Sequence, residues 1–228
     1  MKSNIVTMLA AYCAAIAVEA QAIPVIDQDI LYSKDPANIY LASAFGGRIW
    51  ITQSLTAGLT GHLVRLDLQV AAMRTSDLRV RFGAGEFTDP AFVLLWQGDV
   101  PRAALPDRAA LEAGALTSID LSSAGLSLVR GGDYSITLTS TDEGGPAGGF
   151  LWVIGEVDAA GNQFLNPPYS GGAAQGSIDA GVTWTPRSVD RPFRTWILPV
   201  PEPAGWALLP IGLALAAGLA RRRAAHPG

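Results

Sequence analysis

The chain has few residues able to carry out nucleophilic or metal-based chemistry. Among its 228 residues are one cysteine, Cys13, and two histidines. Cys13 lies in an N-terminal segment that we expect to be removed, which leaves no disulfide, thiol nucleophile or cysteine-ligated metal. His62 has no second histidine in the body of the chain, so we expect a surface or strand-edge residue rather than a general base or zinc ligand.

Positive charge is also scarce. From residue 23 to residue 200 there are 18 Asp and Glu against 12 Lys and Arg. Nucleic-acid binding needs a basic surface, so no nucleic-acid partner is expected. The chain has no Gly-x-Ser-x-Gly elbow and no GxxxxGK[ST] phosphate loop. We therefore predict no catalytic residue, cofactor or metal site.

The N-terminus has the three-part layout of a secretory signal peptide. Lys2 supplies a short positive start, Ile5–Val18 is free of charge, and Ala20 and Ala22 are small residues at the positions that signal peptidase reads. We predict a signal helix over residues 1–22, with cleavage after Ala22. An uncleaved N-terminal anchor is the alternative.

The C-terminus combines three features. Pro201, Glu202 and Pro203 come first, and two prolines remove two amide donors from any regular element. Ala204–Ala220 follows without a charge and would span about 26 Å as a helix. The segment then ends in a basic cluster that would stop transfer on the cytoplasmic side: Arg221, Arg222 and Arg223. This order predicts a transmembrane helix over about residues 204–220.

Together with the signal peptide, the tail over residues 200–228 resembles the PEP-CTERM sorting signal. The resemblance implies a bacterial protein that passes through a Gram-negative-type envelope. Its implied partner is an exosortase, a transpeptidase-like membrane enzyme that processes the tail. The implied destination is the cell surface or an extracellular polysaccharide matrix. An ordinary single-pass anchor with a chance Pro-Glu-Pro is the alternative, with the same membrane topology.

Several segments of the body alternate between apolar and polar residues. In Leu63–Val70, Asp77–Phe82 and Tyr134–Thr141 the apolar residues share one face and the polar residues the other, as in half-buried antiparallel strands. Glycine and proline turns separate these segments from further candidates, which are Ile49–Leu55, Phe92–Trp96, Thr117–Leu121, Phe150–Val157 and Phe193–Leu198. The pattern predicts an all-β fold, a single antiparallel, jelly-roll-like β-sandwich over residues 23–199.

Two local features complete the predicted domain. Asp107–Ala113 can form a short helix with Asp107 as its N-cap, and Ile23–Ala44 is expected to hold one edge strand. The body also resembles a β-sandwich domain often found ahead of this sorting tail. The segments that carry the likeness are Gln53–Gly58 leading into Leu63–Val70, Leu128–Tyr134, Tyr169–Gly172 and Gly181–Trp184.

Carboxylates and aromatic rings are the remaining candidates for a site. Asp142, Glu143 and Asp158 lie in glycine-containing turns, where carboxylates more often form the turn than bind calcium. Sugars stack on exposed aromatic rings. Trp184 and Tyr169 lie in glycine-rich loops and are the candidate carbohydrate-binding residues, whereas tryptophans within strands are expected in the core.

These features predict a non-enzymatic, exported protein with a structural or adhesive role at the cell surface or in the polysaccharide matrix. A carbohydrate-binding module that recognises the exopolysaccharide is the alternative. A calcium-dependent or hydrolytic enzyme is the third hypothesis. It ranks last because no motif selects a pair of catalytic carboxylates.

Overall fold

A computed structural model describes residues 22–143, 145 and 148–200. The residues predicted to form the signal helix and the sorting tail with its membrane helix lie outside this part of the chain, apart from Ala22 and Val200. Within the described part, no helix is long and apolar enough to cross a membrane. Pro24–Pro199 forms one compact unit.

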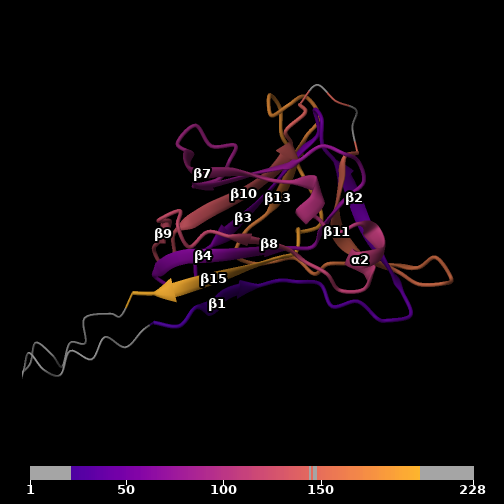
Figure 1. The fold of residues 1–228 in the computed structure, drawn as a ribbon, viewed down its shortest axis with the longest axis horizontal. Coiled ribbons are helices and arrows are strands. Elements are labelled where there is room, and N and C mark those ends of the chain that lie inside the picture. The colour runs from indigo at the N-terminus through magenta and orange to yellow at the C-terminus, as the bar shows by residue number, and fades with distance from the viewer. Residues whose placement is uncertain (1–21, 144, 146–147, 201–228) are drawn as a thin grey trace, which may run out of the picture. The chain divides into compact units, whose positions relative to one another are not determined.

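The body is all-β, and every strand pairing in it is antiparallel. Figure 1 shows the strands and their order along the chain. The first sheet has the order β1 (Val25–Asp29), β15 (Phe193–Pro199), β4 (Gly61–Leu68) and β8 (Thr117–Asp120), with β9 (Ser127–Leu128) also paired to β4.

The second sheet has the order β14 (Thr185–Pro186), β13 (Ala174–Ser177), β3 (Trp50–Thr56), β10 (Asp133–Ser140), β6 (Leu78–Ala84) and β7 (Val93–Val100). The third has the order β12 (Gln163–Leu165), β11 (Phe150–Val157) and β2 (Ile39–Phe45), with β5 (Val70–Ala72) also paired to β11. Two short helical segments, η1 (Arg102–Ala104) and α2 (Arg108–Glu112), lie between β7 and β8.

All three sheets contribute to one hydrophobic core. Leu66 and Phe193 come from the first sheet, Phe82 from the second, and Phe45 and Trp152 from the third. These side chains have no exposed surface. The resulting architecture is β-sandwich-like, because each sheet turns one apolar face towards the shared core.

Two sequence predictions are confirmed in detail. In β6, Leu78, Val80 and Phe82 are fully buried, as their alternation indicates. Asp107 is the N-cap of α2, where its carboxylate accepts a hydrogen bond of 2.8 Å from the backbone N–H of Ala110.

In β4, the predicted division into an inner and an outer face is partly wrong. The pairing of β4 with β15 shifts register at Val64, so Leu63 enters the core and Val64 stays partly exposed. Asp67 and Gln69, which alternation assigns to solvent, are buried. Other side chains cover them, as described below.

The polar face of β10 was also predicted to be exposed to solvent, but it is buried. Ser135 and Thr137 are buried. The Ser135 hydroxyl accepts a hydrogen bond from the backbone N–H of Phe87 and donates to the carbonyl of Gly85, so the loop after β6 covers this end of the strand. Thr137 donates to the Thr52 hydroxyl of the neighbouring strand at 2.9 Å.

The first and last strands of the body pair with each other. Residues 23–44 contain β1 and the start of β2, rather than the single edge strand expected. β1 lies at the edge of its sheet and pairs with β15, with Val25 opposite Ile197. Val25 begins β1 and Ile197 lies near the end of β15, so the two ends of the body leave it side by side (Figure 1).

Candidate functional site

Tyr169, one of the two predicted sugar-binding residues, lines a groove of about 480 Å³. The segment after β1 forms one wall and a proline-containing loop forms the other. The lining residues are Asp29–Ser33, Asn166–Ser170 and Asp190. The groove thus combines two tyrosine rings and two prolines with carboxylate, amide and hydroxyl groups, which is the mixture that ligand sites commonly present.

The ring of Tyr169 is held firmly in the wall of this groove. Its hydroxyl donates to Oε1 of Gln28 at 2.8 Å, and its ring meets Phe193 edge-on with centroids 5.9 Å apart. Its backbone N–H donates to Oδ2 of Asp190 at 2.6 Å. Burial raises the pKa of the Tyr169 hydroxyl, so the group is a neutral donor at physiological pH.

Asp190 connects the groove to the core of the second sheet. Its Oδ1 accepts from the side-chain amide of Gln53, which has no exposed surface, and its backbone carbonyl accepts from the amide of Asn166. Asn166 is 8% exposed, and its Oδ1 has no hydrogen-bond partner within the described part of the protein. This oxygen is buried behind the groove wall, so a ligand in the groove does not reach it.

Three of the segments that resemble the tail-associated domain meet beside this groove, at Thr56, Asp133 and Gly171. Gln53 and Thr56 lie on β3, and the Thr56 hydroxyl lies within hydrogen-bond distance of two acceptors, Oδ1 of Asp133 at 2.8 Å and the carbonyl of Gly171 at 3.0 Å. Gly172 passes so close to β3 that an added Cβ would lie 1.9 Å from the carbonyl oxygen of Ser54. Only glycine fits at position 172, so close packing against β3 explains this residue of the Tyr169–Gly172 segment.

A second depression of about 660 Å³ lies against the same segment after β1. It shares Asp29, Leu31, Tyr32 and Ser33 with the first and adds Lys34, Tyr40, Gln69, Glu112 and Arg194, among other residues. Gln69 fixes Tyr32 through two hydrogen bonds, accepting from its N–H at 2.7 Å and donating to its carbonyl at 2.8 Å. Sequence reasoning missed Tyr32, because the segment from 23 to 44 has no clear alternation.

Trp184, the other predicted sugar-binding residue, lies elsewhere. Its ring packs against Phe87 with centroids 5.3 Å apart, and Phe87 in turn contacts Trp50 and Phe92. Its indole N–H donates to the carbonyl of Gly181 at 3.0 Å. Trp184 is partly exposed but lines neither depression described above. The structure therefore does not bring Trp184 and Tyr169 into one site.

The loop before Trp184 is pinned by Asp179. Its two carboxylate oxygens accept hydrogen bonds from the N–H and hydroxyl of Thr183 and from the hydroxyl of Ser177. The bonds from Thr183 have the largest effect, and together these bonds lower the pKa of Asp179 to about 2. The carboxylate is an internal loop anchor rather than a free ligand.

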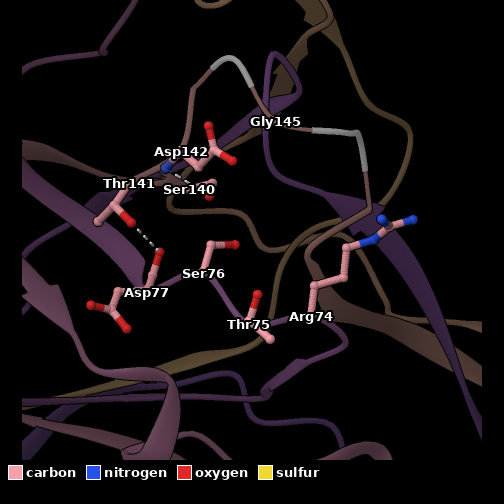
Figure 2. Close-up of a pocket in the computed structure, with 8 residues that line it drawn as sticks. All are labelled: Arg74, Thr75, Ser76, Asp77, Ser140, Thr141, Asp142 and Gly145. Atoms are coloured by element: carbon pink, nitrogen blue, oxygen red, sulfur yellow. Dashed lines mark hydrogen bonds between the residues drawn. The ribbon is translucent and has the colours of Figure 1, made fainter.

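A polar depression of about 560 Å³ lies between the loops that follow β5 and β10 (Figure 2). Its lining residues are Arg74–Asp77, Ser140–Asp142 and Gly145. Figure 2 shows hydroxyl and carboxylate groups around it but no aromatic ring. The neighbouring carboxylates of Asp142 and Glu143 diverge, since Asp142 lines the depression whereas Glu143 forms ion pairs with Arg79 and Arg81 at 3.7 and 3.4 Å.

The other candidate ligands are engaged locally. Asp158 accepts from the backbone N–H groups of Ala160 and Asn162, as expected of a turn-forming acid. His62 is exposed and contacts the Ser127 hydroxyl at 3.2 Å. Across residues 22–143, 145 and 148–200, no three His, Cys, Asp or Glu side chains gather as a metal site would require.

The predicted cleavage residue Ala20 and the sorting residues lie outside the described part of the chain; the latter are Pro201, Glu202, Pro203, Arg221, Arg222 and Arg223. Ala22, the other predicted cleavage residue, is exposed and precedes β1. Compared with known proteins, the chain matches no family model and no curated protein.

Proposed function

We propose that this chain is an exported, non-enzymatic bacterial protein with a structural or adhesive role at the cell surface or in the extracellular polysaccharide matrix. The observation that carries the proposal is the order of features at the two chain ends. A signal peptide over residues 1–22 and a Pro-Glu-Pro, apolar span and arginine cluster over 200–228 match what export and tail sorting need. Between them we propose a jelly-roll-like sandwich, flanked by a signal helix and a transmembrane helix.

The position of the body's ends supports this proposal. Because β1 pairs with β15, the start and the end of the described body lie next to each other, with Val25 opposite Ile197. The groove at Tyr169 is lined by residues beyond the opposite end of β1. The groove therefore lies at the other end of β1 from the points where the body begins and ends.

Alanine replacement of Pro201, Glu202 and Pro203 in the full-length chain tests the sorting proposal. We expect tail processing to fail and the protein to stay in the membrane fraction of its native host. A control with alanines at His226 and Pro227 changes the same tail outside the motif and should be sorted like the parent. Parent-like processing and localisation of the motif variant would contradict the proposal.

A second candidate function is carbohydrate binding, favoured by the tyrosines and amide of the groove at Tyr169. Tyr32 and Tyr169 would bound a sugar ring, and the carboxylate and hydroxyl groups that line the groove would bind the sugar hydroxyls. A glycan array probed with the full-length chain in mild detergent tests it. Binding that is lost in Tyr32→Ala but kept in Tyr12→Ala, a tyrosine of the predicted signal peptide, would support the groove; equal binding by both variants would count against it.

A further inference from the structure

Trp196 lies on the outer face of the first sheet, although tryptophans within strands were predicted to lie in the core. Along β15, Phe193, Thr195 and Ile197 are fully buried, whereas Arg194 and Trp196 alternate with them and are partly exposed. β15 is flanked by β1 and β4, so this ring lies within the sheet face and not at its margin.

A fully buried carboxylate fixes the orientation of this ring. Asp67 of β4 has no exposed side-chain surface, and its Oδ2 accepts from the indole N–H of Trp196 at 2.8 Å. Its Oδ1 accepts from Arg65 Nε and from the Ser118 hydroxyl, both at 2.7 Å. The Arg65 guanidinium lies 5.3 Å from the Trp196 ring centroid. The ring, guanidinium and hydroxyl are thus preorganised by one residue.

A depression of about 580 Å³ opens beside the ring. Its lining combines the indole and two small apolar residues with guanidinium, hydroxyl and carboxylate groups; the residues are Pro24, Val64, Arg65, Ser118, Asp120, Ser122 and Trp196. The volume falls within the range of small-molecule sites. An aromatic ring set among hydrogen-bonding groups suits a ligand with an apolar C–H face and many hydroxyls, which is the chemistry of a pyranose.

Charge on this face narrows the ligand class. Asp67 pairs with Arg65 at 2.7 Å, and Asp29 pairs with Arg194 at 2.8 Å, so a carboxylate of the protein offsets each guanidinium charge. Asp120 adds an exposed negative charge to the depression. Like charges would repel a uronic-acid polymer here, so the face favours uncharged sugars.

We propose that the Trp196 face is a binding site for a pyranose unit of a neutral polysaccharide. The ligand class rests on the second candidate function, but the site is separate from the Tyr169 groove. The face fits a protein partner poorly, since a protein interface needs a broad apolar core whereas this face offers one ring among charged and hydroxyl groups.

Affinity electrophoresis of the full-length chain in mild detergent tests the proposal, with glucan, mannan, galactan or alginate cast in the gel. We expect a neutral polysaccharide to retard the parent and Trp196→Ala to weaken the retardation by on the order of tenfold or more. Since Trp196→Ala also leaves Oδ2 of Asp67 without its donor, Ser122→Leu is the second variant. It obstructs the depression without touching the Asp67 network, and Ser123→Leu is its matched exposed neighbour.

The proposal holds if Ser122→Leu loses retardation while Ser123→Leu and Tyr169→Ala keep it. Retardation lost only in Tyr169→Ala would overturn the Trp196 site and leave the groove proposal standing. If no neutral polysaccharide retards the parent protein, or if only alginate retards it, the Trp196 site is overturned. A Trp196-dependent dimer in size-exclusion chromatography without retardation would overturn it in favour of self-association.

Discussion

Replacing Asp67 with asparagine removes one negative charge from a site with no exposed side-chain surface. Oδ1 can still accept from Arg65 and Ser118, but an amide NH₂ in place of Oδ2 would face the indole N–H of Trp196. One charge-assisted hydrogen bond is lost, worth about 1.5–3 kcal/mol, and a buried donor is left unpaired. We expect a loss of about 2–4 kcal/mol in the free energy of unfolding.

For a domain of this size, that loss lowers the thermal midpoint by roughly 5–15 °C. Circular dichroism melts of parent and Asp67→Asn at pH 7 measure it. Asp120→Asn removes an exposed carboxylate from the same sheet face and should leave the midpoint near the parent's. A shift below about 2 °C for Asp67→Asn, with a parent-like spectrum, would refute the role given to the Asp67 network.

The pH dependence of this difference has a definite sign. Burial alone raises the pKa of Asp67, but hydrogen bonds from Arg65, Ser118 and Trp196 outweigh it and hold the pKa below its usual value of 3.8. The stabilisation is therefore complete above about pH 5, where the carboxyl is ionised in the unfolded chain as well, and is lost as the pH falls through the lowered pKa. The gap between parent and Asp67→Asn should narrow in that acidic range; a constant gap would argue against an ionised Asp67.

Three further predictions concern other parts of the body. Trp152→Ala removes a fully buried ring and its bond to the Pro192 carbonyl, and should cost about 3–5 kcal/mol in chemical denaturation, while Trp184→Ala, at a partly exposed ring, should cost less. Gly172→Ala would place a Cβ against the carbonyl oxygen of Ser54 and should lower the melting midpoint. In Gly114→Ser the new side chain would meet no neighbouring atom, so only the backbone at its positive φ would be strained and the midpoint should fall less. With the pKa of Asp179 lowered to about 2, the 177–183 loop should resist proteolysis at pH 4 and lose protection as the pH approaches 2. Asp179→Ala should be cleaved faster than the parent at pH 4, and the difference should shrink towards pH 2; equal cleavage at pH 4 would contradict the anchor role.

Local alternation predicted much of the fold. β6 reads correctly from Leu78, Val80 and Phe82, because one of its faces packs into the core. The N-cap preference of aspartate correctly predicted α2, because Asp107 caps the helix by accepting a hydrogen bond from Ala110, only three residues along the chain. Such signals depend on residues close in sequence, and single-sequence reasoning captures them well.

Features set by distant residues were harder to predict. The burial of Asp67 depends on Trp196, which is 129 positions away in the chain. The same alternation that put Phe193 and Ile197 inside also put Trp196 outside, a signal that the general preference of tryptophan for cores obscured. The grooves join segments that no local pattern relates, so Tyr169 was predicted from its glycine-rich loop but Tyr32 and Asn166 were not.

The most direct test of export and sorting is the intact mass of the protein recovered from the surface or matrix of its native host. We expect a mass that lacks residues 1–22 and has lost the arginine cluster at Arg221, Arg222 and Arg223. A surface-recovered protein that begins at Met1, or that still carries the whole tail to Gly228, would contradict the proposed processing.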